Sequence, residues 1–281
     1  MMTSVDFIAS ETVIRIVFFV ALFAGMAIWE VLSPRRLQGV GRSGRWPGNL
    51  AVTVINAVLL RMVFPVTAVG LAASVETGGV GLLNVAGGPF WLRIAAAVVV
   101  LDLAIYLQHV LFHAVPALWR LHRMHHADLA FDVTTGTRFH PIEMILSMVL
   151  KFMVIAAFGA PAAAVLIFEV LLNGTSMFNH GNVGLPLRFD RVIRWLVVTP
   201  DMHRVHHSIE RHETNSKFGF NLSCWDRLFG TYRAQPGAGH EGMTIGIETF
   251  RTPDELRLGR MLAQPFKGPV GVYPIGRRRR K

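Results

Sequence analysis

The sequence LDLAIYLQHVLFHAVPALWRLHRMHH, at residues 101–126, joins an apolar segment to a run of histidines. The apolar segment occupies residues 91–115. This is long enough to cross a bilayer, since a membrane helix needs about 20 mostly apolar residues. Asp102 lies within it, and a carboxylate at that depth is costly and commonly functional. The stretch therefore predicts a membrane helix that presents histidines at one surface of the bilayer.

The whole chain has the composition of a membrane protein. Of its 281 residues, 52% are hydrophobic and only 16% are charged, whereas about a quarter of the residues of a soluble domain are charged. Three further apolar segments, at residues 13–31, 50–75 and 142–178, are long enough to enter a bilayer. Gly-Ala-Pro at residues 159–161 divides the last one, which predicts a helical hairpin that dips into the membrane and returns. The expected fold is an all-α integral membrane helical bundle.

The basic residues are distributed unequally between the loops. Residues 76–89 contain no Lys or Arg, whereas the first loop contains four arginines: Arg35, Arg36, Arg42 and Arg45. Because loops rich in Lys and Arg stay in the cytoplasm, the first loop is predicted to be cytoplasmic and the second external. The third span then returns to the cytoplasm, and residues 179–281 remain there. This predicts a cytoplasmic helical cap on the bundle.

The chain is strongly basic at its C-terminal end. Its formal net charge is +10, and residues 277–281 read RRRRK. In a membrane protein such a run is expected to contact anionic lipid headgroups, and no nucleic-acid partner is predicted. Residues 187–198 have an amphipathic pattern with three arginines, which predicts a helix in the membrane interface. The single cysteine, Cys224, excludes an intrachain disulfide.

Three histidine clusters follow the membrane segments. They read H-x-x-x-H at residues 109–113, and H-x-x-H-H at both 122–126 and 203–207. Residues three or four apart share one helix face, so each cluster is expected to project two or three imidazoles into one volume. Thr-Pro-Asp at residues 199–201 predicts the start of the helix that carries the third cluster.

The histidines point to a metal centre. Imidazole is a common ligand of iron, zinc and copper, and two H-x-x-H-H patterns are improbable in a random scatter of twelve histidines. Eight to ten ligands exceed the coordination of one ion, which predicts a dimetal site. The candidate metal ligands are His109, His113, His122, His125, His126, His140, His180, His203, His206 and His207.

In order and spacing these clusters resemble the three histidine boxes of the fatty acid hydroxylase/sterol desaturase superfamily of membrane di-iron enzymes. Similarity also covers RFHP at residues 138–141, NHGN at 179–182, and residues 218–231. The resemblance divides the chain into N-terminal transmembrane helices (1–90), a catalytic domain (91–235) and a C-terminal basic tail (236–281).

The resemblance implies an O2-dependent oxygenase that hydroxylates or desaturates a sterol-like, fatty acyl or alkylglycerol lipid. It implies two Fe ions, with Zn able to replace them in a purified sample, and an external electron-transfer protein as electron donor. The chain departs from one branch of the family, because His180 is followed by Gly184 where some fatty acid hydroxylases have a second histidine. This favours the sterol-desaturase or alkylglycerol-monooxygenase branches. It also makes His140 a candidate substitute ligand, although a lone histidine is equally compatible with a structural role.

Two carboxylates are candidate catalytic residues. Asp102 lies seven residues before His109, and is expected to line the substrate cavity or to support the ligands. The alternative is an ion pair with Arg61. Glu143 is expected to accept a hydrogen bond from an imidazole, or else to supply negative charge to the first turn of a helix.

Two other functions are compatible with many histidines. A non-catalytic membrane protein could store or transport metal. A transport path, however, needs polar residues along several membrane spans, whereas these histidines lie at one end of the spans. A hydrolytic zinc enzyme needs an open metal position and one general base. The H-E-x-x-H pattern of zinc proteases is absent from the sequence.

Overall fold

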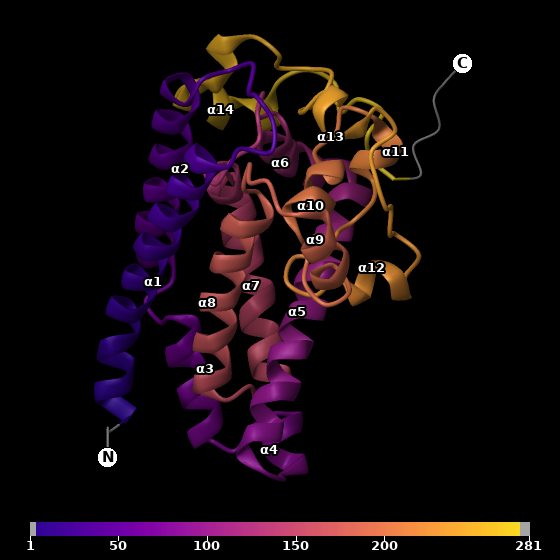
Figure 1. Cartoon of the computed structure of the whole chain (residues 1–281). Coiled ribbons are helices and arrows are strands. Elements are labelled where there is room, and N and C mark those ends of the chain that lie inside the picture. Colours follow the sequence, from indigo (N-terminus) through magenta and orange to yellow (C-terminus); the bar gives the residue numbers. More distant parts are fainter. Residues whose placement is uncertain (1–3, 276–281) are drawn as a thin grey trace.

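The structure, a computed structural model, describes residues 4–275, with side chains from Glu11 onward, and the regular secondary structure of this part is helical (Figure 1). It contains three isolated β-bridges and no β-strand. Five segments are long and apolar enough to cross a bilayer. The predicted all-α membrane bundle is therefore confirmed.

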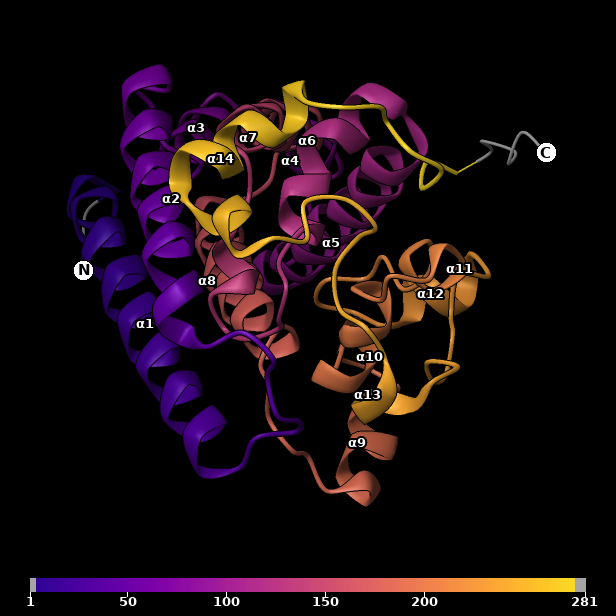
Figure 2. The ribbon, with the colours of Figure 1, turned by 90° about the horizontal axis from the view of Figure 1, so that it is seen from above.

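The long helices run side by side, and most of the short helices gather at one end and along one side (Figures 1 and 2). The long helices are α1 (Ser4–Leu32), α2 (Arg42–Val63), α5 (Phe90–Ala114), α7 (Pro141–Phe158) and α8 (Ala162–Asn179). The shorter helices α3 (Ala68–Thr77) and α4 (Leu82–Ala86) connect α2 to α5 and lie toward the opposite end of the molecule. The remaining short elements are α6 (Pro116–His126), α9 (Leu187–Ile193), α10 (Pro200–His206), α11 (Arg211–Thr214), α12 (Cys224–Leu228), α13 (Gly239–Gly242), α14 (Leu258–Ala263) and the 3-10 turns η1 (Thr135–Thr137), η2 (Pro253–Leu256) and η3 (Gln264–Phe266).

The second membrane segment is broken. A continuous helix over residues 50–75 was the expectation, but α2 ends at Val63 and α3 begins at Ala68. Pro65 has no backbone N–H and cannot continue a helix. The Thr67 hydroxyl then caps α3 by accepting a hydrogen bond from the Gly70 backbone N–H at 3.0 Å. The prediction of one helix was wrong because hydropathy alone takes no account of the proline and the capping threonine.

The hairpin predicted at residues 142–178 is confirmed. α7 ends at Phe158 and α8 begins at Ala162, with Gly159 in the left-handed region at φ +65°. A Cβ atom at Gly159 would lie 2.5 Å from the carbonyl oxygen of Val80, so the two connections can touch only because this residue is glycine. The α8 arm is the central one: half of its apolar window is buried inside the protein, against 6% for α1.

The predicted amphipathic helix at residues 187–198 is present but shorter, because α9 ends at Ile193. Beyond it the chain turns, and the Val198 backbone N–H donates to the Asn221 carbonyl at 3.0 Å. Large apolar side chains on and after this helix are exposed to solvent: Leu187, Phe189, Val192, Trp195 and Leu196. A position in the membrane interface stays a prediction.

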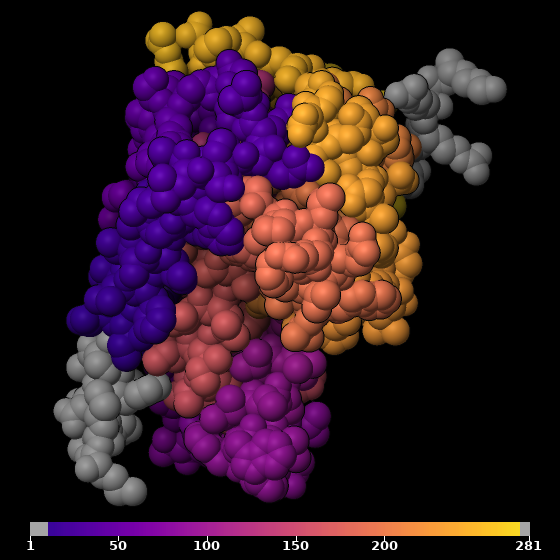
Figure 3. Space-filling model, in the orientation of Figure 1, coloured from indigo at the N-terminus to yellow at the C-terminus, as the bar shows by residue number. Residues whose placement is uncertain are grey.

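The C-terminal segment packs over the helix ends. Met261 of α14 packs against Val52 of α2. The guanidinium of Arg123 on α6 donates to the carbonyls of Gln264, Lys267 and Pro269. Figure 3 shows this segment, in yellow, lying across the end of the molecule. The basic run at residues 277–281 lies outside the described residues.

A buried ion cluster ties the α6–α7 connection to α2. The Arg45 guanidinium donates to both carboxylate oxygens of Asp128, at 2.7 and 2.8 Å, and to Asp132 at 2.6 Å. Arg45 and Asp128 have no solvent exposure. Burial raises the pKa of Asp128, but the Arg45 charge more than offsets this and holds that pKa below its ordinary value. The carboxylate is therefore ionised and paired.

Replacing Arg45 by methionine is expected to lower the free energy of unfolding by about 3–5 kcal/mol, because two buried carboxylates lose their cation. Denaturation of the purified protein in detergent, followed by circular dichroism, would measure the change. Arg257→Met is the matched control. Its ion pair with Asp254 has side chains 80% and 69% exposed, and exposed pairs contribute about 1 kcal/mol at most. An equal loss of unfolding free energy in Arg45→Met and Arg257→Met would contradict the structural role assigned to the Arg45 cluster.

Candidate metal centre

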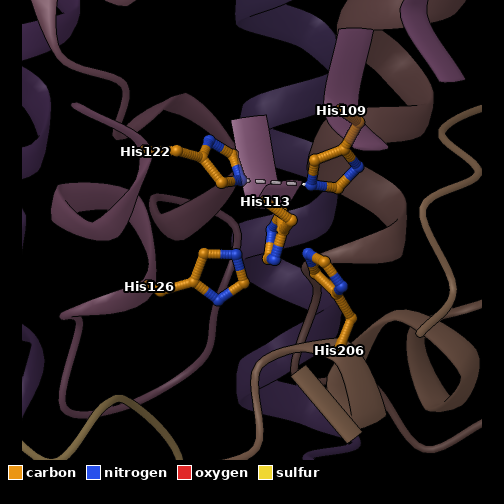
Figure 4. A group of neighbouring side chains, drawn as sticks. All are labelled: His109, His113, His122, His126 and His206. Carbon is orange, nitrogen blue, oxygen red and sulfur yellow. Dashed lines mark hydrogen bonds between the residues drawn. The ribbon is translucent and has the colours of Figure 1, made fainter. Parts of the chain in front are cut away.

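Nine buried histidines meet at one end of the membrane helices and form two groups, within each of which the candidate ligand atoms lie no more than 4.8 Å apart. The first group, drawn in Figure 4, contains His109, His113, His122, His126 and His206. The second group contains His125, His180, His203 and His207. Ring centroids of His126 and His207 are 4.5 Å apart, so the two groups are adjacent.

The first two clusters are brought together by a sharp turn. Val115 is both the last cap residue of α5 and the first cap residue of α6, and Pro116 occupies the first position of α6. Proline suits that position because the first helical N–H has no intrahelical partner. The turn places the ring centroid of His122 4.9 Å from that of His109.

Each H-x-x-H-H cluster is shared between the two groups. In the second cluster His122 and His126 belong to the first group and His125 to the second. In the third cluster the order is reversed, since His203 and His207 belong to the second group and His206 to the first. The first and last histidines lie four residues apart on one helix face, while the middle one faces the neighbouring group. Each cluster therefore places two imidazoles in one group, as expected, and the third histidine of each H-x-x-H-H cluster belongs to the other group.

The predicted start of α10 is confirmed. The Thr199 hydroxyl accepts a hydrogen bond from the Met202 backbone N–H at 3.4 Å, and Pro200 is the first helical residue. The Asp201 carboxylate, in the first turn, pairs with Arg35 at 3.2 Å and with Arg204. The loop between α1 and α2 is thus fastened to the helix that carries the third cluster.

Six of the nine rings are oriented by an acceptor at Nδ1. Backbone carbonyls accept from His109 (Phe218, 2.9 Å), His125 (Arg138, 3.2 Å), His180 (Ser176, 2.7 Å) and His206 (Ser216, 2.7 Å), and side chains accept from His122 (Glu143, 2.7 Å) and His113 (Asn215, 3.2 Å). A carbonyl or carboxylate oxygen can only accept, so in these rings the proton sits on Nδ1. The Nε2 lone pair is left for a metal, which is how metal-binding histidines are commonly held.

The inward-facing nitrogens fit metal ions. Nε2 of His109 and Nε2 of His122 are 3.1 Å apart (Figure 4), and those of His125 and His180 are 3.2 Å apart. Because the proton of each ring is committed at Nδ1, two lone pairs face each other in each case and repel unless a cation lies between or beside them. Neither nitrogen of His126 has a hydrogen-bond partner, although buried polar atoms nearly always have one. A cation in each group would satisfy the facing nitrogens and one nitrogen of His126.

Neutral imidazole is the form that binds a metal, and burial favours it in several of these rings. Burial, followed by the neighbouring imidazoles, holds the pKa of His125, His126 and His207 well below the usual range. Burial also lowers the pKa of His180, to about 3. No carboxylate belongs to either group, so within the described residues the donor set is all imidazole. Such a set suits iron, zinc or copper.

His140, the tenth predicted ligand, belongs to neither group. Its Nδ1 accepts a hydrogen bond from the Ile142 backbone N–H at 3.2 Å, so the ring caps the start of α7. Its Nε2 lies 3.3 Å from the Leu262 carbonyl and donates to it. With both nitrogens used in this way the side chain has a structural role, which is the alternative that the sequence left open.

The two candidate carboxylates have different environments. Glu143 accepts from His122, and this predicted hydrogen bond is confirmed. Asp102 neither lines the cavity described below nor pairs with Arg61. Its Oδ2 instead accepts from the Trp225 indole N–H at 2.8 Å and from the Leu222 backbone N–H at 3.2 Å. Asp102 therefore anchors the loop whose Phe218 carbonyl orients His109.

Sequence reasoning missed the loop that orients three candidate ligands, His109, His113 and His206. The carbonyls of Ser216 and Phe218 and the amide of Asn215 all bind histidine rings. Asp226 shapes this loop by accepting from the backbone N–H groups of Phe218 and Gly219, at 2.8 and 3.1 Å. Every residue has a backbone carbonyl, so the sequence cannot indicate which carbonyls orient a histidine. Only the side chains of Asp226 and Asn215 offered any signal in the sequence.

A cavity of about 630 Å³ leads from the first group into the membrane part of the molecule. His109, His122 and Glu143 line one end of it. Aromatic side chains line the same region: Phe112, Phe139 and Phe220. Two candidate metal ligands thus border a largely apolar chamber between the long helices.

The similarity to known proteins covers the residues that form this site. The model of the fatty acid hydroxylase family matches residues 94–231, a range that contains every histidine of both groups. The chain belongs to the fatty acid hydroxylase/sterol desaturase superfamily. With five candidate spans, it is an integral membrane member of this superfamily. No solved structure gives a significant match.

Several characterised proteins of this superfamily are similar to the chain. Ornithine lipid hydroxylase OlsE of Rhizobium tropici is 29% identical over 193 residues, which cover 68% of this chain and 55% of that protein. Alkylglycerol monooxygenase of Homo sapiens is 29% identical over 53% of this chain and 32% of its own length. Cholesterol 25-hydroxylase of Rattus norvegicus is 24% identical over 48% and 45%. The chain thus spans about half, or less, of these relatives, and their names support an oxidoreductase.

The ligand assignment predicts metal content. His206→Ala and His207→Ala are each expected to lower the metal bound per chain from two ions to one or fewer, measured by elemental analysis of purified protein. His140→Asn is the matched control, since asparagine is also a good N-cap, and it is expected to keep both ions. Loss of an ion in His140→Asn would make His140 a ligand and contradict this description of the site.

Glu143→Gln is expected to weaken metal binding about 10–100-fold, because hydrogen-bond partners of ligating histidines contribute on that scale. The weaker acceptor polarises the His122 ring less. Competition with a chelator of known affinity measures the change, with the exposed Glu248→Gln as control. Unchanged affinity in Glu143→Gln would show that the His122 contact does not tune the metal.

Proposed function

We propose that this protein is a membrane-bound, O2-dependent di-iron oxygenase that hydroxylates or desaturates a lipid. The observation that carries the proposal is that His109 and His122 belong to a metal-binding group and also line a cavity that extends between the membrane helices. A lipid tail in that cavity would reach the metals without leaving an apolar environment. The hydroxylase and monooxygenase names of the relatives support the same class of reaction.

The proposed ligand set is the nine histidines of the two groups, without His140. Iron fits better than zinc for oxidation, since zinc has no redox chemistry. Two iron ions, when bound, would supply the oxidising power for an unreactive C–H bond. In hydroxylation one atom of O2 enters the C–H bond and the other leaves as water, with two electrons from an external electron-transfer protein and two protons from the solvent. In desaturation two hydrogens leave the lipid, and with two further electrons from that protein and two protons from the solvent both oxygen atoms leave as water.

The chain's own residues would position the substrate and the ligands. Phe112, Phe139 and Phe220 give the cavity apolar walls near the metals, which hold a hydrocarbon and exclude water. Glu143 keeps the proton of His122 at Nδ1. Asp102 would act at a distance, by fixing the loop that orients His109.

We place the metal site on the cytoplasmic side. The arginine-rich first loop is expected to be cytoplasmic, and Arg35 of that loop pairs with Asp201 beside the third histidine cluster. This contact supports a common side for the loop and the metals. An electron-transfer protein would then reach the short helices from the cytosol while the lipid enters from the bilayer.

The reaction itself can be tested with 18O2. Iron-loaded protein in lipid nanodiscs, given a chemical reductant and a total lipid extract, is expected to consume O2. Mass spectrometry should then find a lipid that has gained one labelled oxygen or lost two hydrogens. The His206→Ala variant should form neither product. The His140→Asn variant should consume O2 and form the same product as the wild type. Release of a lipid fragment without O2 consumption would instead identify a hydrolase.

A further inference from the structure

Charged side chains line the part of the cavity that lies deeper in the membrane region. They come from four helices: Arg15 of α1, Arg61 of α2, Lys151 of α7 and Glu169 of α8. The Lys151 ammonium is 2.7 Å, and the Arg15 guanidinium 3.1 Å, from the Glu169 carboxylate. Charged groups inside a membrane protein are rare, and they commonly mark the path of a substrate.

Helix geometry places this charged end away from the metals. Lys151 follows Glu143 by eight residues on α7, which is about 12 Å along the helix axis. Glu169 precedes His180 by eleven residues on α8, which is about 16 Å. Phe64 and Phe152 are in ring contact at 5.2 Å, which brings the end of α2, with Arg61, beside Lys151.

The charges do not balance. Three basic side chains face one carboxylate at this end, because the only other acidic residue among the lining residues, Glu143, is bound to His122. Arg15 and Lys151 share Glu169, and among the described residues Arg61 forms no ion pair. The Arg61 side chain lines the cavity and is exposed, so its charge is accessible to a ligand there. An anionic group in the cavity would neutralise it.

We propose that the charged end of the cavity binds an anionic group of the substrate, a carboxylate or a phosphate. The substrate would be an amphiphile whose hydrocarbon extends from this group toward His109 and His122. A cavity of about 630 Å³ is the size of a site for one small ligand, which favours a single-chain amphiphile over a two-chain lipid. This inference rests on the proposed function and adds the substrate class.

The separation also sets the position of oxidation. A fully extended chain advances about 1.2 Å per bond, so 12–16 Å corresponds to about 10–13 bonds. The carbon presented to the metals is thus remote from the acidic group and not adjacent to it. Arg61, which gives up no protein ion pair when it binds the ligand, is the residue expected to decide between charged and uncharged lipids.

Equilibrium binding of radiolabelled palmitate, hexadecyl phosphate and hexadecanol to metal-loaded protein in nanodiscs tests this site. The wild-type protein is expected to bind at least one of the two anions about tenfold more tightly than hexadecanol. Arg61→Met should remove that preference while leaving hexadecanol binding unchanged, and Arg61→Lys should restore it in part. Preference for both anions, or for only one, supports the site and identifies the acidic group.

Arg93→Met is the control, since Arg93 pairs with Asn84 and Glu76 on α4 and α3 and does not line the cavity. Equal binding of all three lipids by the wild type, or an equal loss for all three in Arg61→Met, would overturn the inference. Because binding is measured without turnover, it is independent of the oxygenase test. A retained anion preference without any lipid oxidation would leave the site standing and refute the proposed function.

Discussion

The packing of nine imidazoles into one buried space is the constraint on which the rest of the structure depends. Six of these rings turn one nitrogen toward their neighbours and give the other a hydrogen-bond acceptor. The partners are mostly backbone carbonyls of irregular segments and helix ends, such as those of Ser216 and Phe218. In a regular helix the backbone carbonyls already accept hydrogen bonds from N–H groups of the same helix, so they are not available to a histidine ring. This explains why short helices and loops, together with the ends of the long helices α5 and α8, surround the site.

The bilayer imposes a second constraint on the same residues. Helix α5 is apolar for most of its length and carries histidines in its last turns, because a cluster of ligands can be surrounded by polar backbone only beyond the hydrocarbon core. The cavity joins these two environments. Its aromatic walls meet the first histidine group, so hydrocarbon and metals can come into contact at the boundary between the long and short helices.

Two charge clusters differ in their burial and in the completeness of their ion pairs. In the cluster around Arg45, the guanidinium is bound on three sides, and its two carboxylates are closed off from solvent. That cluster is complete and holds the α6–α7 connection in place. The cluster around Glu169 lies on a cavity and carries more cations than its carboxylate can neutralise. Completeness of pairing, rather than burial alone, separates a structural ion pair from a binding site.

The sequence by itself determined the elements that depend on neighbours along the chain. Hydropathy located the apolar segments, although not the break between α2 and α3. Gly159 and Pro161 determined the hairpin, and the spacing within each histidine cluster determined which rings share a helix face. Only the tertiary structure decided how each H-x-x-H-H cluster divides between two groups, and that His140 caps α7 while Asp102 holds a distant loop. The physical reason is that spacing sets the direction of a side chain, whereas its partner comes from another helix, remote in the sequence, that packs against that face.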